Sequence, residues 1–275
     1  MDGTHSFMFP PGKTLEGELS AAMKRIEKEG ITYPRGYYDL LVEKYRRETL
    51  LYPFTLILIG NRRIQNHFFY SSLHEQAGRF LDYGCGTGDG VRQLIRDGFP
   101  REKITAFDIN WSAINLGFDL YRDRGEMPGI FVVSGTFPFG IVEFDSVYSN
   151  FVLHCIADDE EYARYLKNAY SVLRPGGIFF GSTIGMVEDG GKFTCDNGLQ
   201  KLTTREQLMD SLTAAGFTHH GIVQHPVIPG FISTLVTGCR ASGFPRAICR
   251  YLFARSVVCN NYNRCFFDFC GEKPQ

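Results

Sequence analysis

The segment Phe80-Leu81-Asp82-Tyr83-Gly84-Cys85-Gly86-Thr87-Gly88 decides the fold. Its first four residues are typical of a short strand, and the three glycines stand before a helix predicted to begin at Val91. Glycine lets the backbone turn sharply and lets a ligand approach with no Cβ in the way. A dinucleotide-binding turn would need glycine at position 89, where the chain has Asp89, and no Gly-Lys-Ser/Thr ending is present. The segment therefore predicts a ligand-binding turn of another kind, with an ordinary tight turn as the alternative.

Predicted strands and helices alternate after this turn. Further strands are predicted at residues 104–107, 130–133, 146–149, 178–180 and 221–224, with helices at 91–95, 112–121 and 162–173 between them. A capping box of Thr203 and Glu206 is predicted to open one more helix, which ends at Ala215. The alternation predicts an α/β fold with a doubly wound, mostly parallel seven-stranded sheet. Either Ile232–Val236 or Cys265–Phe269 supplies the seventh strand.

The first 78 residues are predicted to form a helical cap that belongs to the same domain as residues 79–275. Apolar residues recur at helical spacing between Thr14 and Lys28, and a second helix follows Pro34. These helices offer too little apolar surface to fold alone. The apolar run Leu50–Ile59 contains Pro53 and is about half the roughly 20 residues of a membrane-spanning helix, so we expect it to be buried in the cap.

The composition is that of an ordinary globular protein. Of the 275 residues, 44% are hydrophobic and 21% are charged, and the formal net charge is −1. Such a balance gives no basic excess for holding nucleic acid. The N-terminus lacks the pattern of a signal peptide, so the expected location is cytoplasmic, with no membrane span. The eight cysteines contain no C-x-x-C pair and are expected to be free thiols.

Asp108 is a second candidate binding residue, because it ends the predicted strand that follows the glycine turn. An acidic side chain there can accept hydrogen bonds from both hydroxyls of a ribose. The alternative is that Asp108 only caps the next helix. The glycine turn and this acid, each following a strand, together favour a ligand site at the carboxyl edge of the sheet.

Four features together resemble the class I S-adenosylmethionine-dependent methyltransferases, over about residues 79 to 225. They are Leu81-Asp82-x-Gly-x-Gly-x-Gly88, Asp108, the Phe144-Asp145 pair before the fourth strand, and Leu173-Arg174-Pro175-Gly176-Gly177. The resemblance implies a Rossmann-like fold, an enzyme, and S-adenosyl-L-methionine as its cofactor.

The resemblance also implies roles for individual residues. The methionine part of the cofactor would lie against Asp82, Gly84, Cys85, Gly86 and Gly88. Asp108 would hold the ribose and Ile109 would pack on the adenine, while Asn150 and Phe151 would border the transferred methyl group. Many relatives read the adenine amine with the acid of a Gly-Asp pair. Here the pair is Gly135-Thr136, which leaves Thr136 as the candidate at that position.

Candidates for catalysis and acceptor binding are less specific. His154 is a candidate base and acceptor contact, because an imidazole titrates near neutral pH, although a histidine that only packs or hydrogen-bonds is the alternative. Tyr38 and Tyr45 could shape the acceptor site, but aromatic residues at helical spacing are more often core. Metal-dependent relatives use acidic ligands near the end of the fourth strand. Asn150 stands there instead, so no metal is expected.

Three functions stay open on the sequence. The first is methylation of a small, fairly apolar metabolite. The second is an RNA methyltransferase, since the stretch from Phe144 to Thr183 is similar to messenger-RNA cap guanine-N7 enzymes; the near-neutral charge weighs against nucleic acid. The third is a regulator that binds the cofactor without turnover.

Overall fold

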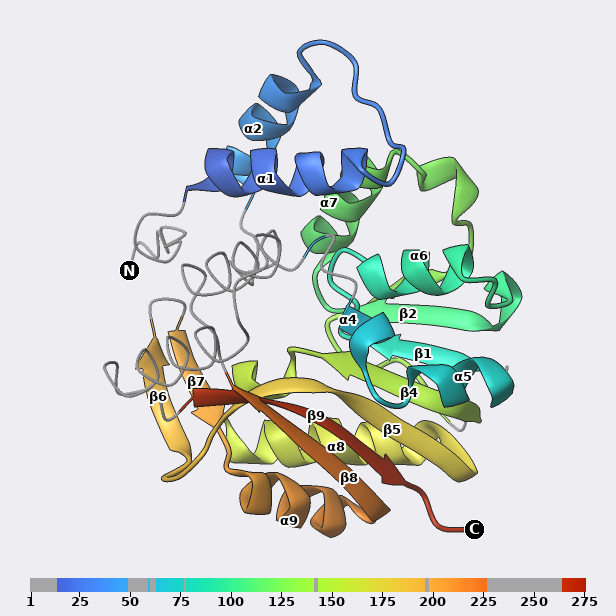
Figure 1. The fold of residues 1–275 in the computed structure, drawn as a ribbon, viewed down its shortest axis with the longest axis vertical. Coiled ribbons are helices and arrows are strands. Elements are labelled where there is room, and N and C mark those ends of the chain that lie inside the picture. The colour runs from blue at the N-terminus through green and yellow to red at the C-terminus, as the bar shows by residue number, and fades with distance from the viewer. Residues whose placement is uncertain are drawn as a thin grey trace, which may run out of the picture.

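The computed structural model describes residues 14–48, 59, 63–76, 78–140, 143–195, 198–226 and 264–275. Within them, seven strands form one sheet in the order β3-β2-β1-β4-β5-β9-β8 (Figure 1). The strands are β1 (Phe80–Tyr83), β2 (Ile104–Asp108), β3 (Phe131–Val133), β4 (Phe144–Asn150), β5 (Leu173–Met186), β8 (Thr218–Pro226) and β9 (Arg264–Glu272). Strands β1 to β5 pair in parallel, whereas β9 is antiparallel to both β5 and β8. The predicted fold class is confirmed.

The C-terminal strand settles the seventh position of the sheet. The segment Cys265–Phe269 lies inside β9, between β5 and β8, so this alternative of the two predicted is confirmed. The other candidate, Ile232–Val236, lies outside the described residues. β5 is far longer than the predicted 178–180, because it begins directly at Leu173 and continues along β9 to Met186.

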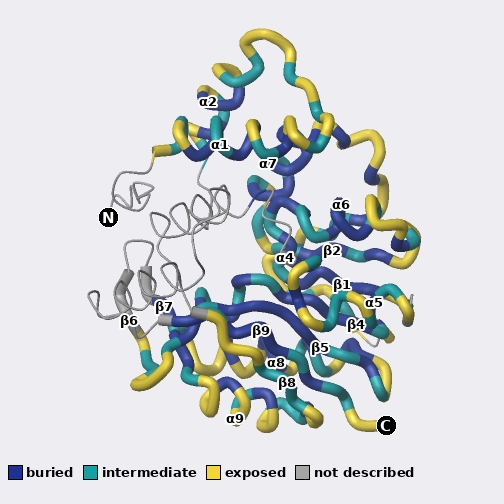
Figure 2. Tube along the Cα trace, viewed as in Figure 1, coloured by how far each residue is buried: buried dark blue, intermediate teal, exposed yellow. Residues whose placement is uncertain are grey.

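Helices cover both faces of the sheet (Figures 1 and 2). The helices are α1 (Leu15–Glu27), α2 (Tyr37–Arg47), α4 (Arg63–Asn66), α5 (Tyr70–Gln76), α6 (Asp89–Arg96), α7 (Trp111–Tyr121), α8 (Asp159–Val172) and α9 (Arg205–Ala215), with short 3₁₀ turns at Arg101–Lys103, Arg124–Glu126 and Leu153–Cys155. One core cluster joins α8 and α9 to the face that bears Phe179 and Phe267. A second joins α5, α6 and α7 to the face that bears Tyr148 and Phe180. Burial of both faces explains why β1 reads as an unbroken apolar run apart from Asp82.

The predicted start of α9 was wrong by one residue. The capping box is formed by Thr204 and Gln207, not by Thr203 and Glu206. Thr203 is engaged elsewhere, because it forms a parallel bridge with Gly185, and its carbonyl accepts a hydrogen bond from the N–H of Met186. The helix therefore begins one residue later than the sequence pattern suggested.

The N-terminal helices form a layer against α7, as the cap prediction expected (Figure 1). Their apolar residues share a core cluster with Leu116, Leu120 and Tyr121 of α7. Tyrosine hydroxyls add hydrogen bonds across this contact: Tyr33 donates to the carbonyl of Leu120 at 2.6 Å. The boundary at residue 78 stays a prediction. Of the predicted buried run Leu50–Ile59 only Ile59 is described, and it is fully buried.

A hairpin outside the main sheet was not predicted. β6 (Gly191–Cys195) pairs with β7 (Gly198–Leu202) in an antiparallel register. The dipeptide Asn197-Gly198 is a common hairpin signal and could have indicated it. Within the described part of the chain, no helix is long and apolar enough to cross a membrane.

Candidate functional site

The glycine turn lies at the carboxyl end of β1 and leads into α6. Gly84, Gly86 and Gly88 all have positive φ, at 81°, 54° and 74°. A Cβ on Gly84 would lie 2.4 Å from Cγ2 of Val152, so packing requires glycine there. A Cβ on Gly86 would have no atom of the described residues within 4 Å. The backbone at Gly86 therefore borders space that no described residue fills and that a ligand could enter, and ligand binding at this turn stays a prediction.

Asp108 ends β2 and is tied to the glycine turn. Its carboxylate accepts hydrogen bonds from the N–H of Gly86 at 2.7 Å and from the N–H of Asn110 at 2.8 Å. Burial raises the pKa of Asp108, and these backbone hydrogen bonds oppose the rise. The two predicted binding features, separate in sequence, thus meet at one edge of the sheet. The neighbouring Ile109 is 57% exposed, which leaves an apolar side chain beside this carboxylate.

Asp82 lies beneath the turn and is almost fully buried. Burial raises the pKa of Asp82 to about 8, and the negative charges of Asp108 and Asp89 add to the rise. Three acids therefore surround the glycine turn, and ionisation of one opposes ionisation of the next. Such a site favours a ligand that brings positive charge.

The buried carboxyl of Asp82 should make stability depend on pH. Its folded-state pKa of about 8 exceeds its ordinary value of 3.8, so protonation favours the folded state. The stabilisation is complete below the ordinary value and is lost as the pH rises to about 8. Asp82→Asn should therefore become more stable relative to the wild type as the pH rises through this range, by up to a few kcal/mol, because one unit of pKa shift is worth about 1.4 kcal/mol.

Urea denaturation of the wild type and Asp82→Asn at one acidic pH and one pH above 8 measures this difference. Asp145→Asn, at the opposite edge of the sheet, is the control, because Asp145 is half-buried and paired with Arg174. A stability difference that does not change with pH would contradict the expectation for Asp82.

Arg92 supports the glycine turn and was not among the residues predicted from the sequence. Its guanidinium pairs with both carboxylate oxygens of Asp123, at 2.6 and 2.8 Å, and donates to the carbonyl of Thr87 in the turn. The side chain is 3% exposed and lies 4.4 Å from the ring centroid of Tyr121. An arginine next to the apolar Val91 at the start of α6 was the only signal available in the sequence.

The end of β4 contributes the other predicted cofactor contacts. Oδ1 of Asn150 is buried and has no hydrogen-bond partner among the described residues. Phe151 adopts a φ of 57°, a conformation that costs a bulky side chain roughly 1–2 kcal/mol. Its N–H donates to the carbonyl of Ser182 at 2.7 Å. An unpartnered polar atom beside a strained residue is the kind of arrangement that marks binding sites.

Other predicted residues have mainly structural surroundings. His154 is 1% exposed, and its Nδ1 lies 3.4 Å from the hydroxyl of Thr183. Tyr45 is buried, its hydroxyl donates to Asp119 at 2.7 Å, and burial raises its pKa. Tyr38 donates to the carbonyl of Glu16 at 3.1 Å. These contacts within the protein explain where the three side chains lie without any role in binding the methyl acceptor. Their catalytic or substrate-binding roles therefore stay predictions.

Cys85 and Thr136 differ in their exposure. Cys85 is buried inside the glycine turn, where burial raises the pKa of its thiol, and its N–H donates to the carbonyl of Phe107 at 3.0 Å. Thr136 is exposed after β3, where its N–H donates to the hydroxyl of Ser134 at 3.3 Å.

The described residues contain no group of three or more His, Cys, Asp or Glu side chains that could hold a metal ion.

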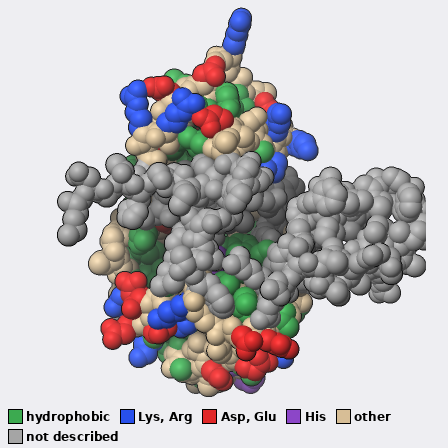
Figure 3. Space-filling view, turned by 90° about the vertical axis from the view of Figure 1, so that its left-hand side faces the viewer, with side chains coloured by type: hydrophobic (Ala, Val, Ile, Leu, Met, Phe, Trp, Pro, Cys, Tyr) green, Lys and Arg blue, Asp and Glu red, His purple; other side chains and the backbone are tan. Residues whose placement is uncertain are grey.

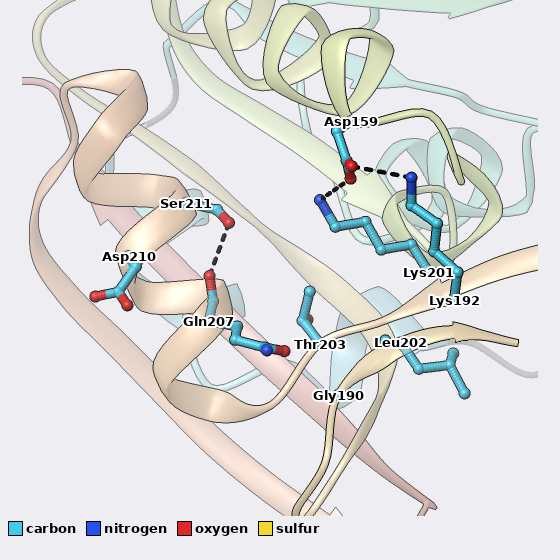
Figure 4. Close-up of a pocket in the computed structure, with 10 residues that line it drawn as sticks. Asp159, Gly190, Lys192, Lys201, Leu202, Thr203, Gln207, Asp210 and Ser211 are labelled. Atoms are coloured by element: carbon cyan, nitrogen blue, oxygen red, sulfur yellow. Dashed lines mark hydrogen bonds and ion pairs between the residues drawn. The ribbon is translucent and has the colours of Figure 1, made fainter.

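A pocket of about 320 Å³ lies between the β6–β7 hairpin and α9 (Figure 4). Lys192 and Lys201 reach Asp159 there, at 2.9 and 3.1 Å. None of its lining residues belongs to the glycine turn or to the ends of β2 and β4. The chemistry predicted from the sequence therefore lies outside this pocket, at the carboxyl edge of the parallel strands.

The strand order, the glycine turn after β1 and the acid after β2 define the class I methyltransferase fold. Residues 80–177 match a family model described as a methyltransferase domain. Over these residues the chain is similar to the class I S-adenosylmethionine-dependent methyltransferases.

Similar proteins share this core over part of their length. The O-methyltransferase atr3 of Stereocaulon alpinum is 30% identical over 133 residues, which are 42% of this chain and 36% of that protein. The ubiquinone/menaquinone biosynthesis C-methyltransferase UbiE of Vibrio cholerae is 32% identical over 102 residues, 36% of this chain and 38% of that protein. The structure of Haemonchus contortus phosphoethanolamine N-methyltransferase 2, solved with S-adenosylhomocysteine, superposes with a TM-score of 0.51 and 19% identity over 72% of this chain and 49% of that one. The chain spans less than half the length of each.

Proposed function

We propose that this chain binds S-adenosyl-L-methionine at the glycine turn and transfers its methyl group to a small-molecule acceptor. The observation that carries the proposal is the space at Gly86 that no described residue fills, with the Asp108 carboxylate at the Gly86 N–H and the exposed Ile109 next to Asp108 in the chain. A nucleoside needs the same three things: room for the ribose, an acceptor for its hydroxyls, and an apolar surface for the base.

The acids around the turn suit the rest of the cofactor. S-Adenosylmethionine carries a sulfonium and an ammonium group, and both would relieve the repulsion among Asp82, Asp89 and Asp108. The buried Oδ1 of Asn150, which has no hydrogen-bond partner among the described residues, offers an acceptor at the neighbouring strand end. The residues present therefore fit the cofactor, although Thr136 replaces the acid that many relatives use to read adenine.

The bound cofactor would supply the reactive methyl group, and the protein would supply alignment. In this proposal Asp108 fixes the ribose, Asp82 and the turn hold the methionine end, and Phe151 excludes water beside the acceptor. Most of the rate enhancement would then come from holding two molecules in line, which needs no general base when the acceptor is already nucleophilic. His154 stays a candidate base, but its burial does not favour that role.

The acceptor class rests on the relatives. Their names describe an O-methyltransferase and a C-methyltransferase of quinone biosynthesis, which supports a small-molecule acceptor and leaves the acceptor atom open. On the face of the molecule in Figure 3, basic and acidic side chains of the described residues are interspersed, which does not favour a nucleic acid backbone. A small, fairly apolar metabolite is therefore the proposed acceptor.

Turnover assays separate the three functions that the sequence left open. We expect release of S-adenosylhomocysteine from S-adenosylmethionine with some members of a panel of small hydroxylated and quinone-like molecules, and none with capped RNA. Release only with capped RNA would favour the RNA methyltransferase. Cofactor binding with no release on any acceptor would favour the regulator.

Two glycine substitutions should separate binding from folding. Gly86→Ala places its methyl group where no described residue lies, so the protein should fold at a cost of roughly 1–2 kcal/mol for its left-handed backbone and lose affinity for S-adenosylmethionine. Gly117→Ala would place a Cβ 2.0 Å from the carbonyl of Thr87 and should destabilise the fold directly. Thermal denaturation with and without S-adenosylhomocysteine measures both effects. Normal cofactor affinity in folded Gly86→Ala would argue against a ligand at this turn.

A further inference from the structure

A row of polar side chains crosses four neighbouring strands next to the end of β4. Asn150 of β4 is in register with Ser182 of β5, which is in register with Asp268 of β9. Asp268 pairs in turn with Val223 of β8, two residues before His225. Because side chains alternate along a strand, all these residues lie on one face of the sheet. The row begins at the residue proposed to border the methyl group.

Asp268 holds the row together. Its Oδ1 accepts a hydrogen bond from the hydroxyl of Ser182 at 2.6 Å, and its Oδ2 lies 2.9 Å from Nε2 of His225. A carboxylate can only accept, so Nε2 of His225 carries the hydrogen that faces Asp268, and in the neutral form of the imidazole Nδ1 is the nitrogen that can accept one. The Asp268 side chain is 12% exposed, whereas that of His225 is 48% exposed. A buried acid therefore orients an imidazole that solvent can reach.

A second histidine on this face is committed to the fold. Nε2 of His67 lies 3.1 Å from the carbonyl of Gly181, and its Nδ1 accepts a hydrogen bond from the N–H of Phe69 at 3.1 Å. Burial lowers the pKa of His67, which keeps it neutral. With both ring nitrogens engaged, His67 is no candidate for binding a ligand, in contrast to His225.

Apolar side chains flank the histidine. Phe266 is in register with both His225 and Ile184, and its ring centroid lies 5.6 Å from that of Phe151, at nearly a right angle. Val223, on the same face, is 41% exposed. Phe151 is also joined to the row through the hydrogen bond from its N–H to the carbonyl of Ser182. An aromatic surface thus adjoins the end of β4 through Phe151, and the oriented imidazole of His225 lies at its far side, on β8.

We propose that this surface, formed by Phe151, Phe266, Val223 and His225, binds an aromatic acceptor that carries a hydroxyl group. The hydroxyl donates to Nδ1 of His225, and Phe266 packs against the ring. Asp268 is a positioning residue, because it holds the imidazole in the accepting tautomer. Its negative charge also disfavours a carboxylate at the same place. The inference rests on the proposed function, because the surface serves as the acceptor side of that site.

Fluorine NMR with two matched probes tests the assignment. In the presence of S-adenosylhomocysteine, the wild-type protein should broaden the resonance of para-fluorophenol more than that of para-fluoroanisole, which has no hydroxyl proton. His225→Phe and Asp268→Asn should lose this preference and still bind the anisole, whereas general damage to the site would weaken both probes. No preference in the wild type, or the same preference in both variants, would overturn the proposal.

The chain contains its own control for this experiment. His219 lies near the other end of β8 and also pairs with a carboxylate of β9, with its Nδ1 3.3 Å from Glu272. His219→Phe should therefore keep the preference for the phenol, and its loss there would contradict a site at His225.

Trp111, the only tryptophan of the chain, is half exposed close to Asp108 and reports cofactor binding by fluorescence. Failure of S-adenosylhomocysteine to change this fluorescence would count against the proposed function, whereas a normal change without phenol preference would refute this inference alone.

Discussion

Replacing Asp108 with alanine is expected to weaken the binding of S-adenosylmethionine by at least about tenfold, which corresponds to roughly 1.4 kcal/mol. Hydrogen bonds to a charged group are worth about 1.5–3 kcal/mol each, and the ribose would offer two donors to this carboxylate. The substitution also removes the acceptor for the N–H of Gly86, so the glycine turn loses its link to β2. Both effects act in the same direction. Calorimetric titration of the wild type and Asp108→Ala measures the difference.

Asp145→Ala is the matched control for this titration. Asp145 also accepts a backbone hydrogen bond, from the N–H of Arg79 at 2.6 Å, but it lies at the amino end of β4, on the opposite edge of the sheet. This variant should lose some stability and keep its cofactor affinity. Equal loss of affinity in both variants would mean that Asp108 acts through the fold alone, and an unchanged affinity in Asp108→Ala would remove it from the site.

Arg92→Met is expected to lower the free energy of unfolding by roughly 3–5 kcal/mol, because it leaves the buried Asp123 without its partner. The pair is 3% and 11% exposed, so water cannot replace the lost contact. The carbonyl of Thr87 also loses its donor, and the glycine turn should become more mobile. Urea denaturation measures the loss of stability, and cofactor titration of the folded variant measures its effect on the turn.

An exposed ion pair provides the comparison for Arg92. Arg164 and Glu161 lie on the surface of α8, each 62% exposed, and Arg164→Met should change stability by about 0–1 kcal/mol. Similar losses in both variants would show that the buried pair contributes no more than a surface one. A double variant of Arg92 and Asp123 that regains most of the stability would support the uncompensated charge as the cause.

Local patterns were sufficient to predict the sheet and the glycine turn. β1 is a short buried strand, and neighbouring side chains leave no room for a Cβ at Gly84 or Gly88 in the turn that follows it. The proximity of the ends of β1 and β2 could be predicted from the sequence, because the carboxyl ends of parallel strands lie at one edge of a sheet. The hydrogen bond from the Gly86 N–H to the Asp108 carboxylate agrees with this expectation.

Features that depend on distant pairing could not be read from the sequence. The length of β5 is set by β9, which lies about 90 residues later in the chain and pairs with it along nine positions. The Arg92–Asp123 and His225–Asp268 pairs join segments 31 and 43 residues apart, and no local spacing indicates either. The spacing of Tyr45 is that of many buried helical residues, so it does not indicate a hydrogen-bond partner. The structure shows that the Tyr45 hydroxyl donates to Asp119.

The most direct test of the central claim is a calorimetric titration of the intact protein with S-adenosylmethionine and S-adenosylhomocysteine. We expect micromolar binding of both at one site per chain, because both share the nucleoside and the ammonium group that the acids at the glycine turn would hold. No binding of either molecule by the folded protein would contradict the proposed function and leave only the fold.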